Sequence, residues 1–241
     1  MNDIYDEVKN RALRPVREND LLREKVVIRA RALSTEEAIG DPERDDFPLQ
    51  KGRERLMQAE FRGAFGQAFS DHFGDFEGSL GEIFDMPLKN NYRRAVFLAA
   101  LNAVFRHLSL IDHTVHCRDK GPTECAARIP SYILERFGRV KVTQVGFQPC
   151  IAEAVAKTFP FRLLDLDADN IGREKFGTVV EGPEKTVEAA DWADLLLVTG
   201  STFGNDTIGR FLTSKPVLFY GTTIAAPAYL FGLERFCTSS T

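Results

Sequence analysis

The second half of the chain alternates short apolar runs with amphipathic segments, and this alternation constrains the fold more than any other feature. Strand-like runs at 141–147, 161–167, 194–200 and 215–221 are separated by segments with helical patterns. Such alternation is typical of βαβ units, whose strands pair in parallel and whose crossovers are right-handed. We therefore expect residues 141–221 to form a mainly parallel sheet.

The first half of the chain shows isolated helix and strand signals instead. Residues 3–14 and 91–108 carry apolar side chains at the spacing of one helix face. Residues 25–33 alternate as a strand does, and residues 55–69 contain two short strand-like runs. A further helix is predicted over 123–137, where the regular alternation begins. These signals indicate a small α+β unit that precedes the parallel sheet.

A domain boundary is predicted between residues 109 and 122, where the character of the sequence changes. The two expected α/β domains span residues 1–112 and 113–241. Residues 34–52 are rich in proline, glycine and acidic side chains, which favours a loop. Loops of that length are commonly functional or mobile.

Composition excludes several classes of protein. The formal net charge is -4, so the chain lacks the basic excess of a nucleic-acid binder. No apolar run approaches the roughly 18 residues that span a bilayer, and the polar N-terminus does not resemble a signal peptide. We therefore expect a cytoplasmic protein without nucleic-acid or membrane partners. Its 4 cysteines are too few for a disulfide scaffold, and they are expected to be buried thiols, reactive groups or metal ligands.

Polar residues follow the first two predicted strands of the sheet. Gly146 permits a tight turn, Gln148 follows it, and Pro149 suits the start of a helix. The three-glycine dinucleotide fingerprint is missing here. Asp165 and Asp167 follow the next strand, about 20 residues after Gly146, where a Rossmann fold holds a ribose hydroxyl. Solvated or helix-capping aspartates explain the same pattern.

The run after the third strand is the most informative. It crowds hydroxyl and amide side chains around a glycine: Thr199, Gly200, Ser201, Thr202, Asn205 and Thr207. We expect a helix to begin near residue 206 and its free N–H groups to bind an anion. Simple helix capping is the alternative. Thr222 and Thr223 repeat the pattern after the next strand, and all these residues should lie at one edge of the sheet.

A separate cluster near the predicted boundary contains His113, His116, Cys117 and Cys125. On a helix the first three would share one face, and imidazole and thiolate are competent ligands for soft metals. The paired CxxC spacing of a structural zinc site is missing. The alternative is an interdomain linker with a hydrogen-bonded histidine and unreactive thiols.

Several motifs together resemble the putative heavy-metal chelation family, the domain of unknown function 364. The motifs are LLLVTGSTFGNDTI, KPVLFYGTTIAAPA, GFQPCIAEAV, DLDADNIG and FLAALNAVFRH, together with the N-terminal run TEEAIGDPERDDFPLQKGRERLMQAEFRGAFGQAFSD. The resemblance implies a small N-terminal α+β domain similar to the enolase N-terminal fold, then a Rossmann-like domain, with the site between them. Residues that fall on the family's signature are Gly146, Gln148, Pro149, Asp165, Thr199, Ser201, Thr202, Asn205, Thr207, Thr222 and Thr223.

The functional hypothesis is a small-molecule or metal-chelate site between the domains. No nucleophile–base pair with diagnostic spacing is visible, so whether the protein is an enzyme stays open. A transition or heavy metal is the cofactor that the resemblance suggests, and a homo-oligomer is among the possible assemblies. One rival is a non-enzymatic metal-binding or chaperone-like protein that uses the histidine–cysteine cluster. Another is a methyltransferase-like enzyme that binds a nucleotide or S-adenosylmethionine, with Asp165 on the ribose.

Overall fold

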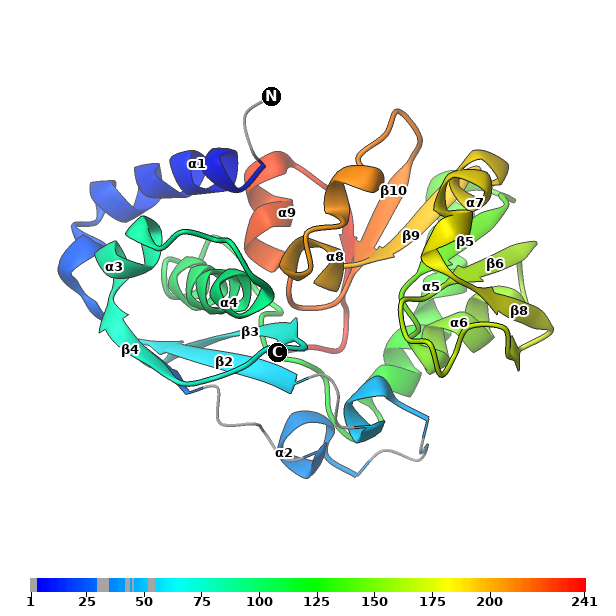
Figure 1. Ribbon diagram of the computed structural model, residues 1–241, viewed down its shortest axis with the longest axis horizontal. Coiled ribbons are helices and arrows are strands. Elements are labelled where there is room, and N and C mark those ends of the chain that lie inside the picture. Colours follow the sequence, from blue (N-terminus) through cyan, green and yellow to red (C-terminus); the bar gives the residue numbers. More distant parts are fainter. Residues whose placement is uncertain (1–3, 30–34, 42–43, 45, 52–54) are drawn as a thin grey trace.

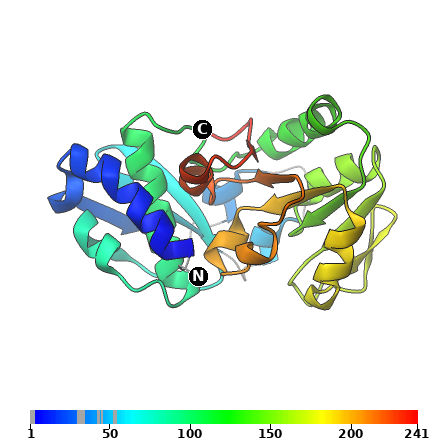
Figure 2. The same cartoon turned by 90° about the horizontal axis from the view of Figure 1, so that it is seen from above.

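A computed structural model describes residues 4–29, 35–41, 44, 46–51 and 55–241 of the chain. Two sheets lie side by side, with the N-terminal sheet on the left of Figure 1 and the larger sheet on the right. Figure 2, the view from above, shows the same separation, with the C-terminal segment running between the two parts. The fold class is the expected one, a small antiparallel unit followed by a Rossmann-like parallel sheet.

The N-terminal sheet has the strand order β3-β2-β1-β4 and is antiparallel in each strand pair. Its strands are β1 (Lys25–Arg29), β2 (Arg55–Phe61), β3 (Ala64–Ser70) and β4 (Phe76–Ser79). The two strand-like runs predicted over 55–69 are therefore confirmed, and they form a hairpin that turns at Arg62 and Gly63. The φ of Gly63 is +81°, which suits a residue without Cβ. The expected strand 25–33 ends at Arg29, and residues 30–33 lie outside the described part.

Helices cover this sheet and connect it to the second one. They are α1 (Ile4–Glu18), α3 (Leu80–Asp85) and α4 (Asn91–His107), with a 3-10 turn η1 at Leu21–Arg23. The helix predicted over 91–108 is confirmed as α4, and it is buried on nearly all sides because it packs against β2, β3, α3, α8 and α9. The predicted helix 3–14 is longer than expected and continues through Pro15 to Glu18.

Part of the loop predicted over 34–52 is helical, which corrects that expectation. It contains α2 (Thr35–Ile39) and a 3-10 helix η2 (Pro48–Lys51). Ala38 and Ile39 are 3% and 1% exposed and join the apolar cluster that includes α5, which explains why the segment is ordered by packing despite its polar composition.

The second sheet has the strand order β11-β10-β9-β5-β6-β8-β7 and is parallel except for the β7–β8 pair. Its strands are β5 (Val142–Val145), β6 (Phe161–Leu164), β7 (Glu174–Lys175), β8 (Thr178–Glu181), β9 (Leu195–Thr199), β10 (Val217–Tyr220) and β11 (Arg235–Phe236). All four predicted strands are confirmed as β5, β6, β9 and β10. The short strands β7, β8 and β11 were not predicted.

Helices lie on both faces of the parallel sheet. They are α5 (Gly121–Phe137), α6 (Pro149–Ala156), α7 (Thr186–Trp192), α8 (Ser201–Gly204) and α9 (Ala225–Phe231), with 3-10 turns η3 (Pro183–Lys185) and η4 (Ile208–Arg210). Leu195 and Leu197 of β9 pack in the cluster that contains α5 and α6, whereas Leu196 and Val198 pack in the cluster that contains α7 and α9. Continuous apolar strands are what a sheet buried on both faces requires.

A buried asparagine fixes the two sheets relative to each other. Asn102 of α4 is fully buried, and its Nδ2 lies 3.0 Å from the carbonyl oxygen of Gln67 and 3.1 Å from that of Thr222. Its Oδ1 accepts a hydrogen bond from the N–H of Ala226 at 2.9 Å. Side-chain contacts of this kind leave little freedom between the sheets, and one apolar cluster also spans both of them. The division into domains near residues 109–122 stays a prediction.

Among the described residues, no helix is long and apolar enough to cross a membrane.

Candidate functional site

The carboxyl ends of β5, β6, β9 and β10 lie at one edge of the parallel sheet because these strands all run in the same direction. Gly146, Asp165, Gly200 and Thr222 follow those ends. The sequence expectation that these residues share one edge is therefore met, and this is the edge at which open α/β sheets bind ligands.

The centre of this edge is built around the backbone of Gly146. The carbonyl oxygen of Gly146 accepts hydrogen bonds from Tyr220 Oη at 2.7 Å and from Gln144 Nε2 at 3.0 Å. Its φ is +86°, and a Cβ at this position would come within 2.6 Å of Thr199 Cγ2. Glycine is thus required twice, by the left-handed conformation and by the close approach of β9.

Sequence reasoning missed Gln144 and Tyr220, although a signal for them exists. Both are polar residues within apolar strands, and both are buried. A buried polar side chain needs a hydrogen-bond partner, so its position in a strand core is informative.

The hydroxyl-rich run after β9 differs from the expected anion site. A four-residue helix, α8, begins directly at Ser201, and only the 3-10 turn η4 follows at 208–210, so the helix expected from residue 206 is wrong. Thr202 Oγ1 donates to the carbonyl of Thr199 at 2.7 Å, and Thr207 Oγ1 donates to Asn205 Oδ1 at 2.7 Å. These side chains close tight local turns, because a short polar side chain competes well for nearby backbone and side-chain groups.

Thr199 and Ser201 keep more freedom for a ligand than the rest of that run. Their hydroxyl oxygens lie 3.3 Å apart, and both residues are half-buried at the end of β9. Gly200 lies between them, and a Cβ there would come within 2.9 Å of Ile224.

The two aspartates after β6 are held by their own turn. Asp165 Oδ1 accepts from the N–H of Leu166 at 2.7 Å, and Oδ2 accepts from Asn170 Nδ2 at 2.6 Å. Asp167 Oδ1 accepts from the N–H of Asp169 at 3.0 Å. Burial raises the pKa of Asp165 despite these hydrogen bonds. The local pattern matches the turn-forming alternative and engages both carboxylate oxygens of Asp165.

Gln148 and Pro149 begin α6. Gln148 Oε1 accepts from the N–H of Ile151 at 2.6 Å and therefore caps the helix. Pro149 occupies the first turn, as its position after the strand predicted.

Thr222 and Thr223 lie where the parallel sheet meets the N-terminal sheet. Each is 1% exposed. Thr223 Oγ1 accepts a hydrogen bond from the N–H of Phe69, the next-to-last residue of β3, at 3.1 Å. Thr223 is therefore engaged by the contact between sheets, whereas the described part of the chain offers no partner to Thr222 Oγ1.

The histidine–cysteine segment is not helical, which corrects the expectation that His113, His116 and Cys117 share a helix face. Residues 111–118 contain neither helix nor strand, because Val115 pairs by two backbone hydrogen bonds with Thr241. His113 Nδ1 contacts the carbonyl oxygen of Ser240. The segment is a connection held by the C-terminus.

The buried surroundings of the Cys117 thiol do not favour metal binding. The four cysteines are free. Burial, reinforced by the nearby Cys237 thiol, raises the pKa of Cys117, and a protonated thiol is a poor ligand. Within the described ranges, no group of three or more His, Cys, Asp or Glu side chains is arranged to hold a metal ion. Direct coordination of the heavy metal that the resemblance suggests does not fit these residues.

Four buried side-chain atoms have no hydrogen-bond partner among the described residues. They are Arg55 Nε, His116 Nδ1, Gln144 Oε1 and Thr222 Oγ1. Arg55 of β2 pairs in register with Ser70, whereas its neighbour Leu56 pairs with Phe69, so the side chains of Arg55 and Phe69 lie on opposite faces of the sheet. The Arg55 guanidinium carbon lies 5.5 Å from the centre of the Phe73 ring. The ring of His116 packs edge-to-face on Phe69, with 5.4 Å between the ring centroids.

Three of these atoms, all but Arg55 Nε, belong to residues that are linked by contacts around Phe69 and Tyr220. Phe69 connects His116 to Thr223, and Phe69 also packs against the apolar cluster that contains Tyr220. Tyr220 shares the carbonyl of Gly146 with Gln144 and precedes Thr222 by two residues. We call this region, with His116, Gln144, Gly146 and Thr222, the edge site.

Comparison with known proteins agrees with the fold and with the sequence motifs. The family model described as putative heavy-metal chelation, domain of unknown function 364, matches residues 130–232. A crystal structure of a protein of unknown function from the same family, from Pyrococcus horikoshii, is 12% identical and covers 95% of this chain and 84% of its own, with a TM-score of 0.59. A second, from Desulfitobacterium hafniense DCB-2, is 14% identical and covers 73% of this chain and 72% of its own, with a TM-score of 0.49.

No protein of curated function matches the chain. The likeness to the Pyrococcus structure extends over both sheets and concerns the fold alone. The family match falls on the parallel sheet and covers the ends of β5, β6, β9 and β10, where Gly146, Asp165, Thr199 and Thr222 lie. The resemblance to the putative heavy-metal chelation family, domain of unknown function 364, is therefore confirmed for residues 130–232.

Proposed function

We propose that this protein binds a small carboxylate-bearing molecule, of the kind that chelates a metal ion, at the edge site. The observation that carries the proposal is that three unpartnered buried polar atoms, those of His116, Gln144 and Thr222, belong to residues linked around one junction of the described chain. Buried polar groups in native proteins are nearly all hydrogen-bonded, so such a group of unpaired atoms indicates a polar ligand or ordered water.

The chemistry of these three atoms suits a ligand that carries carboxylates and a hydroxyl group. Gln144 Oε1 offers an acceptor to an N–H or O–H group, and a hydroxyl or imidazole N–H can donate to a carboxylate. Thr222 Oγ1 can donate or accept. Burial lowers the pKa of His116 to about 4, so its imidazole is neutral near pH 7 and Nδ1 can accept or donate according to tautomer.

The metal would enter with the ligand rather than be held by the protein alone. The described His, Cys, Asp and Glu side chains do not form a coordinating group, whereas the edge site offers hydrogen-bonding groups to a chelate's organic part. This reconciles the family's name with a chain whose described residues form no metal-coordinating group. No reaction follows from these residues, and the proposal is one of binding.

The nucleotide or S-adenosylmethionine alternative is weaker because Asp165 is already engaged. Both of its carboxylate oxygens accept hydrogen bonds within the 165–170 turn, and a ribose diol would have to displace them. The same binding assay includes S-adenosylmethionine as a comparison ligand.

The proposal is tested by calorimetric titration with citrate, nitrilotriacetate, their nickel complexes, bare Ni²⁺ and S-adenosylmethionine. We expect saturable binding of a carboxylate chelator, free or nickel-loaded, and weaker binding of bare Ni²⁺. Thr222→Val should weaken chelator binding about tenfold, the factor of one lost hydrogen bond of about 1.4 kcal/mol. It should leave folding intact because the hydroxyl has no partner in the described chain.

The matched control is Thr178→Val in β8, at the far side of the sheet from β10. It makes the same chemical change away from the edge site and should leave every affinity unchanged. Failure of all the chelators to bind at about 10 mM, or equal effects of the two valine variants, would contradict the proposal. A Kd of about 10 mM corresponds to a binding free energy of only about −2.7 kcal/mol, so weaker binding would not be specific.

A further inference from the structure

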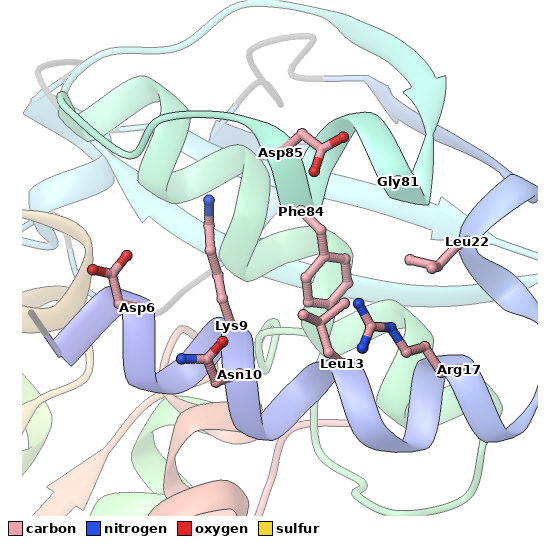
Figure 3. A pocket seen from close by; sticks show the side chains of 9 residues that line it. All are labelled: Asp6, Lys9, Asn10, Leu13, Arg17, Leu22, Gly81, Phe84 and Asp85. Carbon is pink, nitrogen blue, oxygen red and sulfur yellow. The ribbon is translucent and has the colours of Figure 1, made fainter. Parts of the chain in front are cut away.

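A pocket lies in the N-terminal part of the molecule, between α1 and the α3 region. It has a volume of about 510 Å³, which lies in the usual range for small-molecule sites. Figure 3 shows its walls: α1 contributes Lys9, Leu13 and Arg17, and the segment of α3 contributes Phe84 and Asp85. None of these residues belongs to the edge site.

The charges in this pocket are separated by an apolar floor. In Figure 3, Asp6 and Lys9 lie toward one end, Arg17 lies toward the other, and Leu13 and Phe84 lie between them. Lys9 and Arg17 are eight positions apart on one helix, which places their Cα atoms roughly 12 Å apart. A single small anion is therefore an unsuitable occupant, because it would have to contact two distant cations.

The end that contains Lys9 is net negative. Lys9 Nζ donates to the carbonyl oxygen of Met86 at 2.6 Å and lies 5.9 Å from the centre of the Phe97 ring. Burial lowers the pKa of Lys9, and the carboxylates of Asp6 and Asp85 act against that shift. Two carboxylates thus face one ammonium group, and that group already donates a hydrogen bond within the protein.

Arg17 differs from the other arginines of α1. Arg11 pairs with Glu7, and Arg14 pairs with Glu18 at 2.9 Å. No hydrogen bond or ion pair of the Arg17 side chain is found within the described residues, and its guanidinium group lies over the pocket beside Leu13 (Figure 3). A guanidinium group is well suited to a carboxylate.

We infer that this pocket binds a small linear zwitterion. Its cationic group would lie near Asp85 and Asp6, its carboxylate would contact Arg17, and its methylene chain would pack on Leu13 and Phe84. The inference goes beyond the proposed function, since it concerns a different ligand at a different part of the molecule.

The test compares three ligands of equal chain length: 6-aminohexanoate, which carries both charges, and hexanoate and hexylammonium, which carry one each. We expect 6-aminohexanoate to bind about fivefold more tightly than either, the factor expected for one additional exposed ion pair. Affinities are measured by titration calorimetry or by chemical-shift changes at low ionic strength.

Two variants assign the ends of the ligand. Arg17→Gln should weaken the binding of 6-aminohexanoate and hexanoate but not of hexylammonium. Asp85→Asn should weaken the binding of 6-aminohexanoate and hexylammonium but not of hexanoate. Arg14→Gln is the matched control, because Arg14 lies on the same helix outside the pocket. Equal affinities of the three ligands, no saturable binding of 6-aminohexanoate, or an Arg17→Gln effect no larger than the Arg14→Gln effect would overturn the inference.

Discussion

The edge site and the α1–α3 pocket present opposite kinds of polarity. The unpartnered atoms of the edge site are buried and belong to neutral side chains. The pocket is open, and its charged side chains are exposed apart from the half-buried Lys9. Losing a buried hydrogen bond costs much free energy, whereas solvent and salt weaken the interactions between exposed charges. The comparison predicts that substitutions at the junction between the sheets change stability or affinity strongly, and that substitutions in the pocket change them little.

The largest expected effect comes from removing the asparagine that joins the sheets. Asn102→Ala leaves the N–H of Ala226 and several buried carbonyls without their partner, and it leaves a small cavity. We expect a loss of about 3–5 kcal/mol in the free energy of unfolding. Urea denaturation measures it.

Asn19→Ala is the control for that prediction. Asn19 Nδ2 donates to the carbonyl of Pro15 at 2.8 Å in an exposed position. Its removal should change the unfolding free energy by no more than about 0.5 kcal/mol. Similar losses in the two variants would mean that the junction is not held by Asn102.

The next effect concerns the close approach at Gly146. Gly146→Ala adds a Cβ that meets Thr199 Cγ2, and the residue keeps a φ of +86°. We expect a loss of about 2–4 kcal/mol from the clash and the left-handed conformation together. Gly172→Ala is the matched variant, with a φ of +79° and no atom within 4 Å of the added Cβ, so it should lose only about 1–2 kcal/mol. Equal losses would show that the clash with β9 does not exist.

A smaller effect should appear as a pH dependence of stability. The pKa of His116 falls from 6.5 to about 4 on folding. Below pH 6.5 the unfolded chain therefore binds a proton that the folded protein excludes, so stability falls as the pH falls toward 4 and is unaffected above that window. The expected loss for this group is about 1.5 kcal/mol between about pH 6.5 and pH 5.

The comparison of His116→Phe with His107→Phe isolates that contribution. Both rings pack edge-to-face on a phenylalanine, with centroid distances of 5.4 Å for His116 and 5.3 Å for His107. The pH dependence between pH 6.5 and pH 5 should shrink only in His116→Phe, as urea denaturation at several pH values would show. An unchanged dependence in this variant would mean that His116 is protonated in the folded protein.

The sequence predicted the parallel sheet well because buried strands in βαβ units are continuous apolar runs. The ends of β5, β6, β9 and β10 follow directly from that pattern, and so does their common edge. The short strands β7 and β11, of two residues each, carry too little pattern to be recognised.

The site residues were harder to predict, because a polar side chain after a strand can serve the backbone or a ligand. Thr202, Thr207 and Gln148 satisfy local groups, which only the geometry reveals. Gln144 did carry a signal that sequence reasoning overlooked, because it is a polar residue within an apolar strand. The helical spacing at His113 and His116 was misleading because the pairing of Val115 with Thr241 keeps that segment out of a helix.

The most direct test of the central claim is the position of a metal chelate in a crystal. Crystals soaked in the nickel complex of citrate would be measured at the nickel absorption edge, which locates the metal by its anomalous signal. The account predicts a peak beside Gln144 and Thr222, with citrate oxygens in hydrogen-bond distance of His116 Nδ1 or Thr222 Oγ1. A peak bound directly by the thiols of Cys117 and Cys237, with the edge site unchanged, would contradict it.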